Sequence, residues 1–314
     1  MKNMNININE LLIAYTLPIG NQLYRVREAS EFDKTDIAQF GYIQDKSQIQ
    51  RFRLNKAGEQ VLYTSTYPTI AERETLKKGQ PEFYLIKFHK KDIYDFVTFT
   101  AIDDTCSKDI KSHSRMAREA TTQYFSKEKL AQIDELRKIL EKDYNDCPKD
   151  EKYKESSELA SKILESADCI LTYSRADDDK KDKIPIGSES NRFLNVTFNK
   201  LATDEHLKIE TIYHCKPKED QYCLRYEILE IGIPNTQYTQ IEWFEWDAEI
   251  DSIIVRGGIP LSKEAFLRKL QKNHIKLTPN VNQPLNDTHV NIISTSASDL
   301  YEVQFGVILK KKNI

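Results

Sequence analysis

The residues with the clearest chemical potential lie between Arg53 and Glu74. A strand is expected to end at Ser65, and a short helix to begin near Pro68. Such a strand-to-helix turn leaves backbone N–H groups unpaired, which favours an anionic ligand. Glu74, about two turns into the helix, would point back towards the turn, whereas Glu72 would point elsewhere. The segment predicts an anion site beside a carboxylate. By spacing alone, a solvated helix surface is the alternative.

Short strands must hold this segment in place. Pro68 suits the first turn of a helix that runs to Leu76, and Gly79 is placed to end it. Alternating or continuous apolar runs rich in strand formers predict the surrounding strands. These strands are expected at residues 24–27, 60–64, 83–88 and 95–101.

A helical block is expected over about residues 107–168. Ser126 can cap a helix, and Phe125 and Leu130 on either side of it have the spacing of a hydrophobic staple. The break at 145–148 separates this helix from a second one. Apolar side chains repeat on one face of each helix, which indicates packing against a core. They are Leu130, Ile133, Leu136 and Leu140 in the first helix, and Leu159, Ala160, Ile163, Leu164 and Ala167 in the second.

Beyond the helical block the pattern returns to strands, at residues 169–173, 207–213 and 223–229. Strands on either side of a helical block indicate an α+β fold. We expect one domain over residues 8–233 and a C-terminal α+β extension over residues 234–314. The extension contains Trp243, Trp246, a helix from Ser262 to Leu270 and a last strand over 301–309.

Composition excludes several classes of protein. The chain has 314 residues, and its 16 tyrosines and 13 phenylalanines are too many aromatic residues for a disordered chain. Its formal net charge of −3 gives no basic field for direct nucleic-acid binding. No apolar run is long enough to cross a bilayer, and the first residues lack the apolar stretch of a signal peptide. The five cysteines show no pairing pattern, which suits a reducing compartment. A cytoplasmic location is therefore expected.

Several short motifs follow one another between residues 20 and 215. They are Leu23-Tyr24-Arg25-Val26, Arg53-Leu54-Asn55, Leu62-Tyr63-Thr64-Ser65, Ala71-Glu72-Arg73-Glu74, Leu171-Thr172-Tyr173-Ser174 and Phe193-Leu194-Asn195-Val196. Through these motifs, in this order, the chain resembles the RES family, whose characteristic polar residues are an arginine, a glutamate and a serine. The chain departs from the family in lacking a glycine before Arg53, in its long helical block, in the charged segment 177–183 and in the tail beyond about 235.

The resemblance implies a fold of ADP-ribosyltransferase type, bearing the inserted helical block and the C-terminal extension. It also implies a toxin that destroys cellular NAD, and a cognate antitoxin with a helix-turn-helix domain as a possible partner. NAD would be the substrate, and no cofactor is expected. Cleavage of the nicotinamide–ribose bond, by hydrolysis or phosphorolysis, builds positive charge on the ribose that a carboxylate can stabilise. Transfer of ADP-ribose to a macromolecule and a non-catalytic role in binding a partner are the alternatives.

Roles for individual residues follow from the same resemblance. Glu74 is expected to be the carboxylate beside the ribose. Arg25, and after it Arg53, would grip the NAD diphosphate through a planar guanidinium. Tyr63 would stack against nicotinamide or adenine, and Ser174 would hydrogen-bond to the nicotinamide or ribose.

Tyr24 and Ser65, which adjoin these residues in the motifs, complete the expected contacts with NAD.

Other candidate sites are weaker. The pair of acids at Glu72 and Glu74 resembles the Glu-x-Glu of arginine-modifying ADP-ribosyltransferases, but too little chain lies between the serine and this pair. The acidic run at 177–179 could hold a divalent cation, yet the lysines that follow favour a solvated loop. His214 and Cys215, together with Cys223, lack the spacing and the fourth ligand of a zinc site. No metal site is therefore expected.

Overall fold

The fold is taken from a computed structural model of the whole chain. The structure describes residues 6–15, 22–29, 33–66, 68–76, 82–102, 113–142, 151–173, 194–218, 225–255, 259–260, 278–279, 289–295 and 302–311.

A single mixed sheet of fourteen strands forms the frame of the described residues. The strands are β1 (Ile13–Tyr15), β2 (Gln22–Glu28), β3 (Val61–Ser65), β4 (Phe83–Lys90), β5 (Phe96–Thr100), β6 (Cys169–Tyr173), β7 (Leu194–Asn199), β8 (Leu207–Lys218), β9 (Arg225–Pro234), β10 (Ile241–Val255), β11 (Ile259–Pro260), β12 (Thr278–Pro279), β13 (His289–Thr295) and β14 (Glu302–Lys311). Their spatial order is β1-β5-β6-β7-β3-β2-β4-β8-β9-β10-β14-β13-β12, and β11 pairs with β10. Of the described strand pairs, only β5 with β6 is parallel.

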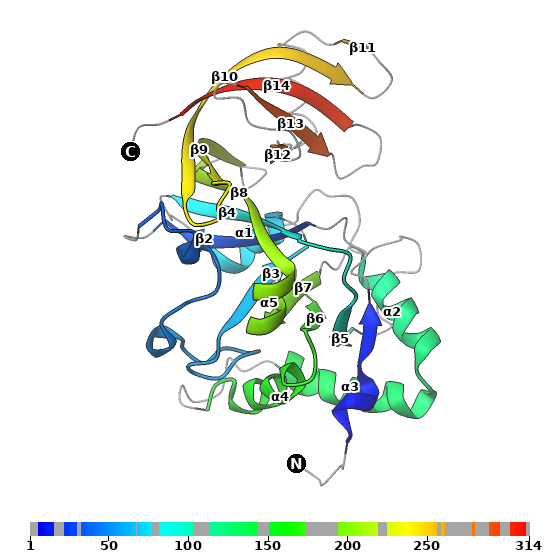
Figure 1. The fold of residues 1–314 in the computed structure, drawn as a ribbon. Coiled ribbons are helices and arrows are strands. Elements are labelled where there is room, and N and C mark those ends of the chain that lie inside the picture. Colours follow the sequence, from blue (N-terminus) through cyan, green and yellow to red (C-terminus); the bar gives the residue numbers. More distant parts are fainter. Residues whose placement is uncertain are drawn as a thin grey trace.

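Five α-helices and three short 3-10 turns accompany the sheet in the described part of the chain. The helices are α1 (Pro68–Thr75), α2 (His113–Tyr124), α3 (Lys127–Glu141), α4 (Lys154–Leu164) and α5 (Lys200–His206). The turns are η1 (Ile8–Leu11), η2 (Ile37–Phe40) and η3 (Lys46–Gln48). In Figure 1, α2, α3 and α4 lie at one end of the molecule, and β10, β13 and β14 at the other.

Two hydrophobic cores lie on opposite faces of the sheet, as alternation along its strands shows. In β3, Leu62 belongs to one core and Val61 to the other. In β6, Leu171 and Ile170 are divided in the same way. Because successive side chains of a strand point to opposite faces, both strands are buried on both sides. The Val61 side is covered by the apolar faces of α3 and α4, and the Leu62 side packs against aromatic residues from β4, β5 and β10.

Most of the elements expected from the sequence are present. The strands β2 to β6 and the helix α1 agree with the predicted segments to within two or three residues at each end. Ser126 caps α3 by accepting a hydrogen bond from Lys129 N at 3.4 Å, and Phe125 before it is buried. The α+β class is therefore confirmed. The helix predicted over 262–270 and the charged segment 177–183 lie outside the described residues.

The long antiparallel strands of the C-terminal half were predicted less completely. The boundary expected between residues 233 and 234 falls within the β9–β10 hairpin, where Pro234 pairs with Ile241. Trp243, beyond that boundary, is 1% exposed and donates a hydrogen bond from Nε1 to Lys34 O at 2.8 Å. The described residues up to Trp243 therefore share the core of the N-terminal part.

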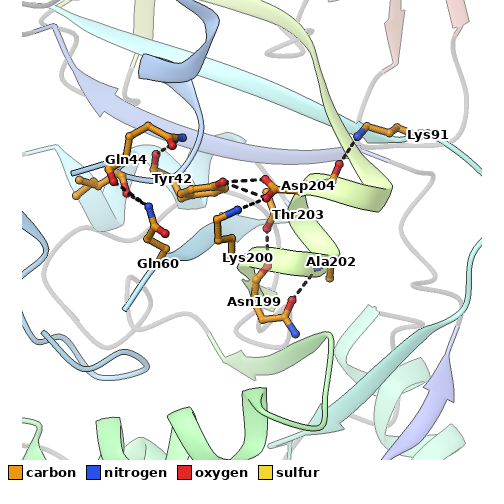
Figure 2. A network of polar contacts seen from close by, with 10 residues as sticks. Tyr42, Gln44, Gln60, Lys91, Asn199, Lys200, Ala202, Thr203 and Asp204 are labelled. Atoms are coloured by element: carbon orange, nitrogen blue, oxygen red, sulfur yellow. Dashed lines mark hydrogen bonds and ion pairs between the residues drawn. The ribbon is translucent and has the colours of Figure 1, made fainter. Parts of the chain in front are cut away.

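Helix α5 ties the segment before β3 to the rest of the fold (Figure 2). Tyr42 donates a hydrogen bond to Asp204 Oδ1 at 2.8 Å, and Lys200 forms an ion pair with the same carboxylate. Gln60 Nε2 donates to Gln44 O at 2.9 Å. Asn199 caps α5 by accepting from Ala202 N at 2.7 Å. These contacts fix both ends of residues 42–60, the segment that carries Arg53.

His89 makes the stability of the fold sensitive to acid. Its pKa is lowered to about 4, first by burial and then by the positive charges of Lys208 and Lys87, although Glu210 lies 3.7 Å from its ring. The unfolded chain takes up a proton near the ordinary pKa of 6.5, and the folded chain only near 4. The stability contribution is therefore complete above pH 6.5 and is lost as the pH falls towards 4.

We expect the substitution H89Q to remove this dependence. Between pH 7 and pH 4.5, the unfolding free energy of the wild type should fall by about 1–2 kcal/mol more than that of H89Q, because His89 is only partly buried and solvent screens its charge. Urea denaturation at the two pH values measures the difference. An equal fall in both proteins would contradict the assignment to His89.

Candidate functional site

β2 and β3 meet at a single residue pair, and the predicted site residues lie around it. Tyr24 is opposite Ser65, whereas the whole of β2 pairs with β4 on its other side and all of β3 pairs with β7. In Figure 1, β3 leaves β2 at a wide angle, and α1 packs against both strands. The ladder between β2 and β3 therefore ends at this pair, next to Arg25 on one strand and close to Tyr63 on the other.

A chain of hydrogen bonds connects this junction to Glu74. Ser65 Oγ donates to Asn195 Oδ1 at 2.8 Å. Asn195 Nδ2 donates to both carboxylate oxygens of Glu74, at 2.6 Å and 2.7 Å. Ser65 and Asn195 are buried, whereas Glu74 is exposed. An exposed carboxylate is thus held in place by a buried amide through charge-assisted bonds, which are the stronger class of hydrogen bond.

The helix α1 presents Glu74 to the sheet through its apolar side. Ile70 and Ala71, four and three residues before Glu74, are buried and lie on the same face of the helix. Glu72 is only 1% exposed and belongs to a different side of α1 from Glu74. The two carboxylates therefore lie in different surroundings, Glu72 buried and Glu74 exposed.

Tyr63 organises the loop before β3. Its hydroxyl donates to Asn55 Oδ1 at 2.9 Å and accepts from Leu54 N at 3.0 Å. Asn55 is 1% exposed, and its Nδ2 donates to the carbonyls of Gln50 and Lys56 at 2.9 Å and 2.8 Å. Burial raises the pKa of Tyr63, and hence the phenol is neutral at physiological pH. The loop that carries Arg53 is held rigidly against β3.

Arg25 is a buried cation at the same junction. Its Nη1 atom is buried and has no hydrogen-bond partner in the described structure, although the residue as a whole is partly exposed. The pKa of Arg25 is lowered to about 10, first by burial and then by repulsion from Arg27, while Tyr63 acts in the opposite direction. The guanidinium is therefore charged at neutral pH. The ion pairs of the described residues do not include one between Arg25 and Glu74, since Glu74 bonds to Asn195 instead.

The structure gathers the predicted residues into two neighbouring groups. Tyr24, Ser65 and Glu74 belong to the group linked through Asn195. The other group is Arg25, Arg53 and Tyr63, in which both guanidinium groups act on the pKa of the tyrosine. Ser174 lies outside the described residues. Tyr173, directly before it, pairs with Leu194, the neighbour of Asn195, so β6 ends beside the first group.

Sequence reasoning included two asparagines in its motifs without assigning either a role. Asn195 lies within the apolar strand β7 and Asn55 within the loop before β3. Asparagine is depleted in strand interiors, so its occurrence between Leu194 and Val196 was a usable signal. The partners of Asn55 lie within eight residues of it, whereas Ser65 and Glu74 lie more than 100 residues before Asn195 and could not be identified from spacing.

The remaining candidates do not add to the site. Within the described ranges, no group of three or more potential ligands could hold a metal ion. The ring nitrogens of His214 lie 2.8 Å from Glu82 and 3.4 Å from Glu230, and Cys215 is buried. Cys223 and the acidic run at 177–179 lie outside the described residues.

Comparison of the chain with models of protein families, with curated proteins and with solved structures gave no match. None of the helices that the structure describes is long and apolar enough to cross a membrane.

The buried Nη1 of Arg25 leads to a prediction about stability. A charged donor without a partner costs about 1–3 kcal/mol when buried, so R25M should raise the unfolding free energy by an amount in that range. Urea denaturation of the wild type and R25M measures the change, and R25K, which keeps a charge, serves as the control. If R25M is instead destabilised by 2 kcal/mol or more (a loss of roughly the size expected for a broken ion pair), Arg25 has a structural partner.

Proposed function

We propose that this protein is a RES-type enzyme with an ADP-ribosyltransferase-like fold that cleaves the nicotinamide–ribose bond of NAD. The observation that carries the proposal is a carboxylate held in place by a buried amide, with Arg25 adding a buried cation one residue beyond the β2–β3 pair. Glu74 is held by Asn195, and Arg25 has a buried, unpartnered Nη1 close to Tyr63. A carboxylate suits the ribose end of NAD, and a guanidinium suits its diphosphate.

The proposed reaction breaks the bond between ribose C1′ and the nicotinamide nitrogen. The bonding electron pair leaves with nicotinamide, and positive charge develops on the ribose. The carboxylate of Glu74 stabilises that charge, because an ionised group fixed in advance needs no reorganisation during the reaction. Water or phosphate then attacks C1′ and gives ADP-ribose or its phosphorylated form.

The other predicted residues would bind the rest of NAD. The positive charges of Arg25 and Arg53 both act on Tyr63, and these guanidinium groups would bind the two phosphates. Tyr24 is partly exposed beside Ser65, and its ring would stack against a base, whereas Tyr63 packs against the core. Ser174 would follow at the end of β6. In this proposal the reaction takes place in the cytoplasm, where it depletes NAD and arrests growth unless an antitoxin with a helix-turn-helix domain binds the enzyme.

The decisive test compares the wild type with E74Q. Purified protein is incubated with NAD labelled on the adenine side, and nicotinamide release and the position of the label are followed. E74Q removes the negative charge of Glu74 without changing the size of the side chain. It should lower the turnover by at least about 100-fold. Thermal melting of both proteins excludes unfolding as the cause.

The location of the label distinguishes the alternatives. Free labelled ADP-ribose, or its phosphorylated form, supports cleavage. Label attached to a protein or nucleic acid would instead support ADP-ribosyl transfer. An absence of turnover by the wild type would refute the enzyme and favour a role in binding a partner. Near-normal turnover by E74Q would refute the role of Glu74.

A further inference from the structure

We infer that Ser65 and Asn195 form a positioning pair that orients the carboxylate of Glu74, and that Ser65 is not an NAD contact. This inference rests on the proposed function and concerns the same site. Ser65 is 2% exposed, and its hydroxyl already donates to Asn195 Oδ1 at 2.8 Å, so it is poorly placed to reach a ligand. Asn195 is 5% exposed and contacts both oxygens of Glu74.

The direction of the hydrogen bonds follows from the charges. An asparagine amide has donors only on nitrogen and acceptors only on oxygen. An ionised carboxylate accepts, so Nδ2 of Asn195 must face Glu74 and Oδ1 must face Ser65. The Ser65 hydroxyl has one proton, and Asn195 Oδ1 at 2.8 Å is a closer acceptor than Leu194 O at 3.2 Å. Ser65 therefore favours the amide orientation that Glu74 requires.

Ser65 and Asn195 both lie in paired strands of the sheet. Ser65 and Asn195 are direct cross-strand partners in the β3–β7 ladder. Glu74, by contrast, is an exposed residue with a long side chain near the end of a short helix. A side chain of this kind samples several rotamers unless a contact selects one. Two donor contacts from a strand residue select the rotamer, and preorganisation of this kind improves catalysis.

Asn199 provides a matched control on the same strand. It is also an asparagine in β7, but its Nδ2 donates to Leu164 O and Ala167 O, and its Oδ1 caps α5. Its role is structural. N199A should therefore lower the melting temperature without a specific effect on turnover.

The first test measures kcat for NAD cleavage and the dissociation constant of ADP-ribose. N195A should lower kcat by roughly 100-fold while the affinity for ADP-ribose changes by less than about threefold, since the diphosphate contacts remain. S65A should lower kcat by about tenfold, and S65T, which retains the hydroxyl, should restore most of it. If N195A resembles N199A, with a lower melting temperature and an unchanged kcat, the inference is wrong.

The pH profile gives a signature that a structural role would not produce. In N195D, the introduced carboxylate repels Glu74 at neutral pH, and after protonation it can donate a hydrogen bond to Glu74. The activity of N195D should therefore recover as the pH falls from 7 to 5, relative to wild type. N199A, which introduces no titratable group, should follow the wild-type profile. A constant ratio of N195D to wild type across this range would contradict the inference.

An infrared measurement separates the inference from the proposed function. The carboxylate stretching band of Glu74, identified by comparison with E74Q in protein labelled with ¹³C-glutamate, should shift in N195A and S65A but not in N199A. If the wild type fails to cleave NAD while the band shifts, the proposed function is wrong and the hydrogen-bonded pair stands. If NAD is cleaved but the band and kcat of N195A are unchanged, the positioning role is wrong and the function stands.

Discussion

The candidate site depends on one constraint, the ending of the β2–β3 ladder at the pair of Tyr24 and Ser65. β2 continues along β4 and β3 along β7, so the two strands separate beyond this point. Backbone groups of a strand that has lost its neighbour must be satisfied in another way. Here side chains and a loop occupy the junction, and it is there that Arg25, Tyr63 and the Asn195 network lie. If the β2–β3 ladder were longer, strand pairing would occupy the space in which these side chains lie.

The polar side chains at the junction differ in whether their hydrogen-bonding groups have partners. The amides of Asn55 and Asn195 have partners at both ends, and they hold the loop before β3 and the carboxylate of Glu74 in place. The buried nitrogen of Arg25 has no partner in the described structure. Satisfied buried groups make a site rigid, whereas an unsatisfied buried charge is a cost that the fold tolerates. Such a cost is understandable where a ligand would supply the missing partner, which is the physical reason for placing the NAD diphosphate at Arg25.

Local patterns were sufficient for much of the architecture. The helix α1, the cap of α3 at Ser126 and the strands β2 to β6 follow from turn residues, capping residues and apolar periodicity, which act over a few neighbours. The long β8, β9 and β10 strands were recognised only in part, because their pairing partners and the burial of Trp243 depend on distant segments. The resemblance to the RES family led to Glu74 and Arg25. It did not lead to the role of Asn195, which is defined by a contact between residues 121 positions apart.

The sequence by itself determined the α+β class, the order of the motifs and the residue types on which the proposed site depends. The tertiary structure decided which of those residues meet. It placed Glu74 against an amide of β7 instead of the guanidinium of Arg25, and it buried Ser65 within the network. The physical reason is that strand register and the divergence of β2 from β3 result from cooperative pairing across the whole sheet. Spacing along the chain carries no information about that pairing.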